Sequence, residues 1–351
     1  MIWIRADGGK EIGTGHIMRC LSVADALSRM GEPVCFLVAD TSAEPFLIKC
    51  GQEYRVLNSD FRKMEDELET LLPLLSGGEK SVFLADSYFV TDSYLNRIRK
   101  YMPVCYMDDR GISGLPVDML INYNIFADPS LYGAAGSEGI SFLLGMEYTP
   151  LRREFQDVPY QVRDRVRRVL ITTGGSDRYD LAGRILEEVL QMPEIENLEY
   201  CVVSGAYNEH LPELQRMAEG HRGVRVFSNV ADMAELMRTC DIAVTAGGST
   251  MYELSAVGVP MICFSFVDNQ EKIVEGFRDR KLVCFGGDYL RQGKQMVRDV
   301  AEHIALLCRD EKLRRRYSEC QRKLVDGQGA LRIAERLCEL KDRQRIGKGL
   351  V

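Results

Sequence analysis

The sequence predicts an α/β protein of two domains, each a parallel β-sheet with helices on both faces. Three observations predict it: short apolar runs alternate with helical stretches, the alternation stops once and then begins again, and 351 residues exceed one ordinary domain. Apolar residues make up 46% of the chain and charged residues 28%, the balance of a folded globular protein. The formal net charge of -7 argues against nucleic acid as a partner, because that affinity comes from excess lysine and arginine.

The predicted first domain covers residues 1–155 and alternates strands with helices. Its strands are expected at 2–5, 33–38, 82–85, 104–107 and 119–121. One helix is expected from residue 17, where Leu21, Ala24 and Leu27 keep helical spacing and Gly31 stands where a left-handed cap would be. Two further helical patterns occupy 64–75 and 93–100. This alternation predicts a parallel sheet covered on both faces.

The predicted second domain covers residues 165–325 and follows a charged connection at 152–168. Its strands are expected at 169–172, 200–203, 224–227, 242–245 and 261–266, with a helix after Tyr179. Both domains are therefore predicted to be Rossmann-like. From about residue 296 the pattern is helical only, with a last helix at 330–342. The final segment, 326–351, is a candidate to pack back on the first domain.

The cysteines and the first residues predict a cytoplasmic protein. Eleven cysteines occur with no Cys-x-x-Cys pair, and several, such as Cys35, Cys201 and Cys263, lie in apolar runs. They are typical of small buried side chains in a reducing compartment. The chain starts directly with a strand pattern, and no stretch reaches membrane-spanning length, so no membrane partner is expected. The sequence leaves the oligomeric state open, and a monomer is compatible with it.

The chemistry is expected in the loops that follow the strands. Open parallel sheets bind ligands beyond the carboxyl ends of their strands, so two facing sheets would form an interdomain cleft. The first such loop runs from Arg5 to His16 and is rich in glycine. A helix N-terminus disfavours a protonated imidazole, so His16 is expected to be neutral near pH 7 and able to act as a general base. A structural histidine that caps the loop fits the same position equally well.

Two familiar phosphate-binding motifs are excluded at this loop. Gly13 and Gly15 have the Gly-x-Gly spacing of a dinucleotide fingerprint, but the third glycine would fall at Met18. No Gly-Lys-Ser/Thr follows the glycines, so the loop is not a P-loop either. We therefore expect neither NAD nor another cofactor.

The second domain offers two glycine loops for a phosphate. Residues 173–177 (TGGSD) follow a strand and open a helix, a weak signal alone. Residues 245–253 (TAGGSTMYE) are stronger, because backbone N–H groups, hydroxyls and a helix dipole converge where a diphosphate would build charge. Glu253, one turn further, is placed to accept hydrogen bonds from ribose hydroxyls. The alternative is an ordinary capped helix, although a Ser-Thr cap does not need paired glycines.

Polar residues follow several other strands and are candidates for substrate contact. They are Asp86 to Tyr88, Asp108 and Asp109, Asn122 to Asn124, and Asp268 to Gln270. Adjacent carboxylates are common at strand ends, and the sequence has no His/Cys ligand spacing, so no metal site is expected.

The opening of the chain also resembles a known family, on two segments: RAD at 5–7 and IGTGHIMRCL at 12–21. They are similar to the signature of the UDP-sugar hydrolases of pseudaminic acid biosynthesis. Those enzymes convert UDP-2,4-diacetamido-2,4,6-trideoxy-beta-L-altropyranose to the free sugar and UDP, and are related in fold to MurG-type glycosyltransferases. The resemblance spans residues 2 to 280 and implies the GT-B arrangement of two Rossmann-like domains facing across a cleft.

The resemblance implies roles for specific residues. The implied catalytic residues are His16, as the base, and Asn269. The substrate-binding candidates are Arg5, Asp7, Gly15, Asp86, Tyr88, Asp109, Arg152 and Gln270. The nucleotide-binding candidates are Gly174, Gly175, Ser176, Asp177, Asn229, Val230, Gly247, Gly248, Ser249, Thr250 and Glu253. The implied reaction is metal-independent inverting hydrolysis, in which His16 deprotonates water. Two other functions stay open: a MurG-like glycosyltransferase with a sugar hydroxyl as acceptor, and a noncatalytic protein that binds a UDP-sugar.

Overall fold

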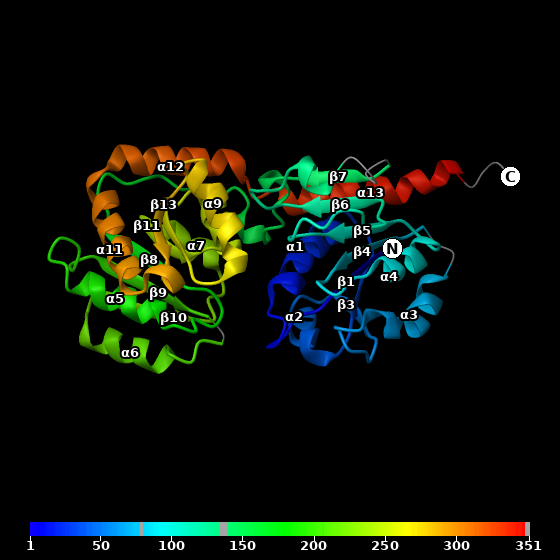
Figure 1. The fold of residues 1–351 in the computed structure, drawn as a ribbon, viewed down its shortest axis with the longest axis horizontal. Helices are drawn as coiled ribbons and strands as arrows, with labels where there is room; N and C mark the ends of the chain where they lie inside the picture. The colour runs from blue at the N-terminus through cyan, green and yellow to red at the C-terminus, as the bar shows by residue number, and fades with distance from the viewer. Residues whose placement is uncertain (78–79, 134–138, 206, 348–351) are drawn as a thin grey trace. The chain divides into compact units, whose positions relative to one another are not determined.

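The computed structural model describes residues 1–77, 80–133, 139–205 and 207–347. The chain forms two compact units, shown with their elements in Figure 1. The first unit contains Met1–Arg153 together with the chain from Gln328 onward, and the second contains Glu154–Gly327. From the sequence, the first domain was predicted to end at residue 155, and the second to run from 165 to 325.

The first unit is built on one parallel sheet. Its strands are β1 (Ile2–Ala6), β2 (Val34–Val38), β3 (Glu53–Val56), β4 (Val82–Asp86), β5 (Val104–Met107), β6 (Met119–Asn122) and β7 (Ser141–Leu144). They lie in the order β3-β2-β1-β4-β5-β6-β7, and every pair is parallel. The sequence reasoning did not include the two edge strands, β3 and β7.

Helices cover both faces of this sheet. They are α1 (Gly15–Arg29), α2 (Glu44–Lys49), α3 (Leu68–Leu75), α4 (Asp92–Arg99) and α13 (Gly329–Gly347). On one face, apolar side chains of α3 and α4 pack with Phe83, Val104 and Tyr106 of the sheet. On the other face, α13, drawn in red in Figure 1, packs against α1. The last helix thus belongs to the first unit.

The chain reverses its direction across the first sheet between β1 and β4. The strands β1, β2 and β3 run outward to one edge, and β4 then returns to pair with β1, where Ala6 is opposite Asp86. A parallel sheet binds ligands at such a switch point, because the helices that follow the two strands lie on opposite faces and leave an opening.

The second unit repeats this architecture with six parallel strands. They are β8 (Arg168–Thr172), β9 (Glu199–Ser204), β10 (Val224–Ser228), β11 (Ile242–Ala246), β12 (Met261–Ser265) and β13 (Cys284–Asp288), in the order β10-β9-β8-β11-β12-β13. The switch point lies between β8 and β11. Strand β13 was not predicted, because two glycines occupy its centre and interrupt the apolar pattern.

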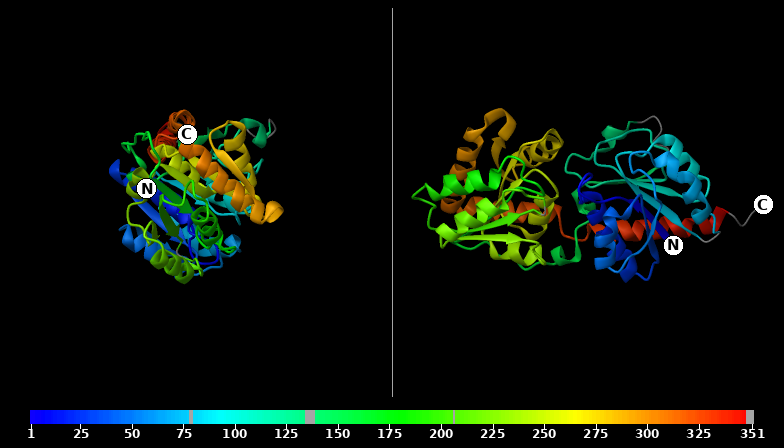
Figure 2. Two further views of the ribbon diagram at one scale, coloured as in Figure 1. Left: turned by 90° about the vertical axis from the view of Figure 1, so that its left-hand side faces the viewer. Right: turned by 90° about the horizontal axis from the view of Figure 1, so that it is seen from below.

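Eight helices are described in the second unit. They are α5 (Leu181–Leu190), α6 (Leu211–Gly220), α7 (Met233–Thr239), α8 (Ser249–Val257), α9 (Glu271–Asp279), α10 (Tyr289–Gln292), α11 (Lys294–Arg309) and α12 (Glu311–Leu324). Apolar residues of α5, α6 and α11 form the core on one face of the sheet, while α8 packs against α12 and α7. Figure 2 shows helices flanking the strands of each unit. Among the described helices, none is long and apolar enough to cross a membrane.

Candidate functional site

His16 lies at the carboxyl edge of the first sheet, beside the switch point. It is the second residue of α1, directly after Gly15, and its side chain is only 6% exposed. The loop before it packs closely on α1: a Cβ on Gly8 would lie 2.4 Å from Cγ2 of Ile17. A glycine at this position therefore lets the loop after β1 lie against the start of the helix that carries His16.

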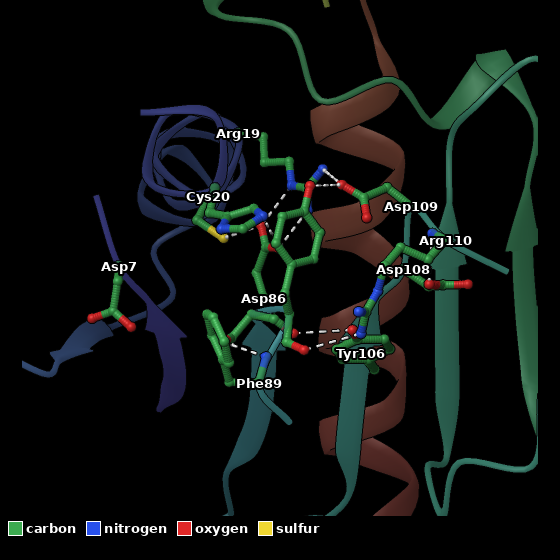
Figure 3. Close-up of polar contacts among 12 residues, drawn as sticks. Asp7, Arg19, Cys20, Asp86, Phe89, Tyr106, Asp108, Asp109 and Arg110 are labelled. Carbon is green, nitrogen blue, oxygen red and sulfur yellow. Dashed lines mark hydrogen bonds and ion pairs between the residues drawn. The ribbon is translucent and has the colours of Figure 1, made fainter. Parts of the chain in front are cut away.

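Arg19 connects α1 to the end of β4. Its Nε donates to Oδ2 of Asp86 at 2.6 Å and its Nη2 donates to Oδ1 at 2.5 Å, so both carboxylate oxygens are bound. Figure 3 shows Arg19 and Cys20 directed from α1 toward Asp86, with Asp109 on the far side of the guanidinium. Both Arg19 and Asp86 are buried, which makes this two-pronged pair rigid as well as strong.

The guanidinium also reaches the loops after β5 and β6. Nη1 of Arg19 donates to Oδ2 of Asp109 at 3.1 Å and to the hydroxyl of Tyr123 at 3.0 Å. Tyr88, in the loop after β4, donates its hydroxyl to the same Oδ2 of Asp109 at 2.9 Å. One arginine thus joins groups that follow three neighbouring strands.

The imidazole of His16 contacts this network at two points. Its Nε2 lies 4.0 Å from Oδ1 of Asp86, too far for a hydrogen bond, and the ring packs edge-to-face against Tyr88 with centroids 4.5 Å apart. Burial is the largest influence on its pKa and lowers it; Asp86 opposes this effect and Arg19 adds to it, so the pKa of His16 is below its usual value. Near neutral pH, the uncharged imidazole is therefore the favoured form of His16 in the folded protein.

The charges of the neighbouring groups are fixed by the same contacts. Burial alone would raise the pKa of Asp86, but Arg19, followed by His16, outweighs it, and the pKa is lowered. Burial and the adjacent carboxylate of Asp109 raise the pKa of Tyr88, so its hydroxyl keeps its proton. Around a neutral imidazole the structure therefore places an ionised carboxylate, a guanidinium and a protonated phenol.

Arg5 was predicted to bind substrate, and in the structure it lies inside the fold. Its side chain is completely buried and donates to Oδ2 of Asp7 at 2.6 Å and to both carboxylate oxygens of Glu67. The second oxygen of Asp7 accepts the backbone N–H of Ala39 at 2.8 Å. Arg5 thus joins β1 to the segment before α3, on the face opposite α1. Asp7, expected to bind substrate as well, has both oxygens engaged within the fold.

The other first-unit candidates lie in different places. Asp86, Tyr88 and Asp109 meet at His16 as described, whereas Arg152 is half-buried in the segment that follows β7. Asp108, next to Asp109, is buried and accepts the backbone N–H groups of the turn that follows it and the hydroxyl of Tyr132. Of the two adjacent carboxylates, Asp109 is thus the one beside His16.

In the second unit, α8 begins beside the switch point, after β11. Gly248 is its N-cap residue and provides no side-chain cap, and Ser249 is exposed at the first helical position. Gly247 is buried against α9: a Cβ there would lie 2.5 Å from Cγ2 of Val274 and 3.0 Å from Cβ of Gln270. A glycine is needed at 247 for the loop to pack this closely, and the start of α8 can accept an anion.

The loop after β8 contains exposed residues and one structural residue. Gly174, Gly175 and Ser176 are exposed, as a ligand-binding loop requires. Asp177, predicted to bind nucleotide, is instead buried, and its two oxygens accept the backbone N–H groups of Leu181 and Ala182 at 2.7 and 3.0 Å. This carboxylate therefore caps the start of α5, and its predicted nucleotide contact stays a prediction.

The remaining second-unit candidates lie in loops at the same edge of the sheet. Asn229 is exposed after β10 with a φ of 52°, and Val230 beside it is half-buried. Asn269 is exposed in the short 3-10 helix Asp268–Gln270 after β12, and Oε1 of Gln270 accepts the N–H of Phe266 at 3.0 Å. Glu253 and Thr250 are half-buried in the first turns of α8. Their nucleotide and substrate roles stay predictions.

The sequence reasoning did not assign a role to Arg19, whereas Tyr123 was among the candidates for substrate contact. Arg19 follows His16 by three positions, so the two share a helix face, a spacing that identifies it as a neighbour of the imidazole. Tyr123 follows β6, as Asp109 follows β5. Within the described ranges, no group of three or more histidine, cysteine or acidic side chains is placed to hold a metal ion.

Comparisons with known proteins agree with this architecture. The model of the glycosyltransferase family 28 C-terminal domain matches residues 169–275. The crystal structure of Acinetobacter baumannii MurG superposes with a TM-score of 0.70 at 14% identity, over 96% of this chain and 99% of that one. The chain has the GT-B fold. Two Rossmann-like halves, each with a parallel sheet and interleaved helices, are common to both proteins, which confirms the fold predicted from the sequence.

Sequence relatives extend over most of the chain. The spore coat polysaccharide biosynthesis protein SpsG of Bacillus subtilis is 26% identical over 352 residues, covering 98% of this chain and 99% of the relative. The UDP-2,4-diacetamido-2,4,6-trideoxy-beta-L-altropyranose hydrolase of Campylobacter jejuni is 22% identical over 273 residues, covering 77% of this chain and 93% of the relative. The relatives thus include the family that the opening segments resemble.

Proposed function

We propose that this protein hydrolyses a UDP-sugar to UDP and the free sugar, with His16 as the general base. The substrate we propose is UDP-2,4-diacetamido-2,4,6-trideoxy-beta-L-altropyranose, which the name of the Campylobacter relative contains. The observation that carries the proposal is the imidazole of His16: it is buried, its pKa is lowered, and the carboxylate of Asp86 lies 4.0 Å from its Nε2, beyond hydrogen-bond distance. Such a ring accepts a proton at neutral pH.

The proposed reaction is a single displacement at the anomeric carbon. His16 takes a proton from water, the oxygen of that water bonds to the anomeric carbon, and the bond from this carbon to the oxygen of UDP breaks with its electrons. The product sugar has inverted configuration, and UDP departs with the negative charge. The backbone N–H groups at the start of α8, where the N-cap residue provides no side-chain cap, are the proposed stabilisers of that charge.

The proposed contacts divide between the two units. Tyr88 and Asp109 are assigned to the sugar, because they adjoin His16 and follow strands at the carboxyl edge of the first sheet. Asn269, exposed after β12, is assigned a polar contact near the reacting centre. Gly174, Gly175, Ser176 and the residues from Gly247 to Thr250 are assigned to the diphosphate, and Glu253 to the ribose.

A glycosyltransferase is the second candidate function, and two observations favour it. The second unit matches a glycosyltransferase family model, and MurG has the same fold. In this alternative, His16 deprotonates a hydroxyl of an acceptor sugar rather than water, while the UDP-binding groups are the same. A protein that only binds UDP-sugars is the remaining alternative.

Release of UDP without any acceptor separates the three functions. The purified protein is incubated with a panel of UDP-sugars, UDP is quantified, and the sugar product is identified by NMR. The proposal predicts rapid acceptor-independent release of UDP from the diacetamido-trideoxy sugar, with inverted configuration at the anomeric carbon. Release only after an acceptor is added would identify a transferase, and saturable binding without release would identify a binding protein.

A further inference from the structure

His16 and Arg19 both belong to a closed ring of side-chain contacts. The ring runs from the imidazole to Tyr88, from the Tyr88 hydroxyl to Asp109, from Asp109 to Arg19, and from Arg19 to Asp86. Asp86 then lies 4.0 Å from Nε2 of His16 and completes it. The polar contacts along this ring are hydrogen bonds, except for the approach of Asp86 to the imidazole, which is longer.

That long contact has a structural cause. A buried carboxylate next to an imidazole ordinarily forms a hydrogen-bonded pair with it, because the pair neutralises the carboxylate charge. Here both oxygens of Asp86 are bound by the two prongs of Arg19, at 2.6 and 2.5 Å. The guanidinium is itself held on its other side by Asp109 and Tyr123, so it is fixed in this orientation.

We propose that Arg19 is a positioning residue for His16: by binding both oxygens of Asp86, it prevents this carboxylate from pairing with the imidazole. The inference rests on the proposed function, because it assigns Arg19 a part in keeping the proposed base free of its proton. Without Arg19, Asp86 would be a buried carboxylate beside His16 with only the weak thiol donor of Cys20, at 3.4 Å from its Oδ2, and the lowest-energy arrangement would be an imidazolium–carboxylate pair. A protonated His16 is no longer a base.

The charges around His16 come from every element packed against it, and they bear out this reasoning. The groups that act on the imidazole are Arg19 on α1, Asp86 at the end of β4, Asp109 after β5 and Asp7 after β1. The three carboxylates favour the protonated ring, and Arg19 is the one of these groups that disfavours it. After Arg19 is exchanged for a neutral side chain, the charges that remain among these groups all raise the pKa of His16.

The experiment is an NMR titration of His16 in the full-length protein, which needs no substrate. The chain has four histidines, and His16→Asn identifies which signal belongs to residue 16. In Arg19→Met, the titration midpoint of His16 is expected to rise by about one pH unit or more, the effect of an opposite charge 4–6 Å away. An unchanged midpoint in a folded Arg19→Met protein would overturn the proposal.

Two further variants test whether the effect passes through Asp86. The double variant Arg19→Met with Asp86→Asn removes both charges, and its midpoint is expected to return to within about half a unit of the original. A midpoint that stays as high as in Arg19→Met would show that Asp86 is not the intermediary and would contradict the inference. Arg29→Met makes the same exchange at the half-exposed end of α1 and is expected to leave the midpoint unchanged.

Arg19→Lys keeps the test decisive if Arg19→Met does not fold. A lysine retains the charge but lacks the planar fork, so it cannot bind both oxygens of Asp86 and also reach Asp109. The His16 midpoint is expected to rise by less than in Arg19→Met, and an unchanged midpoint would overturn the proposal here too.

The hydrolysis assay then separates this inference from the proposed function. If the protein hydrolyses the UDP-sugar, the acid limb of its kcat/KM profile is expected to move in Arg19→Lys by the same amount as the NMR midpoint. If the protein releases no UDP, the proposed function fails, while the NMR titration still decides whether Arg19 controls the protonation of His16.

Discussion

Burial favours the neutral form of His16, whereas the neighbouring carboxylates favour its charged form. Burial has the larger effect, Arg19 adds to it, and the pKa of the imidazole is lowered. The sequence reasoning expected a neutral ring for a different reason, the dipole of the helix N-terminus. The direction agrees, but the structure makes burial the first cause, which only the packing of Tyr88 and the loops around the ring reveals.

The lowered pKa predicts how activity depends on pH. A base must be unprotonated to act, so kcat/KM is expected to rise with pH through the lowered pKa of His16 and to level off before neutral pH. The midpoint of this acid limb should lie below about 6.5, the ordinary value for histidine. Initial rates of UDP release between pH 4.5 and 8.5 measure it. An acid limb centred above pH 7 would contradict this prediction, because it would mean that the neighbouring carboxylates raise the pKa of His16 by more than burial lowers it.

The partners of charged residues near strand ends could not be predicted from the sequence. Arg5 lies near the carboxyl end of β1 and Asp177 follows β8, each near a glycine loop, as ligand-binding residues do. Arg5 instead pairs with Glu67, which is 62 positions away, and Asp177 turns back to cap α5. Residue type and spacing do not reveal such partners, since the direction of a side chain depends on the whole sheet and its covering helices.

Among the elements, the buried central strands were predictable and the edges were not. β1, β4 and β5 are mainly apolar and almost completely buried, with Arg5 and Asp86 as their charged residues, because both faces of a parallel sheet are covered. β3 reads Glu-Tyr-Arg-Val and alternates exposed with half-buried residues, which is typical of an edge strand and resembles a loop in sequence. The glycine loops after β8 and β11 were predictable, because glycine followed by a helix start is a local signal.

The close packing of the loop after β11 predicts a loss of UDP binding in Gly247→Ala. The added methyl would lie 2.5 Å from Cγ2 of Val274, so the loop must move away from α9 and displace the N–H groups of α8. The dissociation constant of UDP, measured by calorimetry, is expected to rise by about tenfold or more.

Gly220→Ala is the matched control for this variant. It makes the same exchange at the end of α6 in the same unit, where a Cβ would meet no atom within 4 Å, and UDP affinity should be unchanged. Equal affinities for UDP in Gly247→Ala and Gly220→Ala would remove the start of α8 from the proposed site.

The molecule as a whole consists of two similar α/β units, the first of which is completed by the end of the chain. This last part of the chain is α13, which packs against α1 and has three fully buried side chains, those of Ile333, Ala334 and Leu337. The number and type of domains were predictable from the alternation of strand and helix. For segment 326–351, packing on the first domain was a candidate from the sequence, and its place against α1 is seen only in the structure, because an amphipathic helix has the same pattern whichever surface it covers.

This arrangement predicts that Leu337→Ala destabilises the first unit selectively. Removing a buried leucine side chain costs about 2–5 kcal/mol of unfolding free energy. The single tryptophan of the chain, Trp3, lies on β1, so its fluorescence reports unfolding of the first unit, while circular dichroism reports both. In urea, the fluorescence transition should move to lower concentration.

Glu339→Ala, on the half-exposed side of the same helix, is the control and should leave the fluorescence transition nearly in place. Equal shifts in the two variants would contradict the packing of α13 on the first unit.

The proposed function requires that His16 removes a proton from water while other groups hold UDP. The most direct measurement compares His16→Asn with the unmodified protein in two assays, UDP release from the UDP-sugar and UDP binding by calorimetry. The account predicts that turnover falls by about 10²- to 10⁴-fold, the contribution of a general base, while the dissociation constant of UDP stays within a few-fold. Turnover close to that of the unmodified protein would contradict the account.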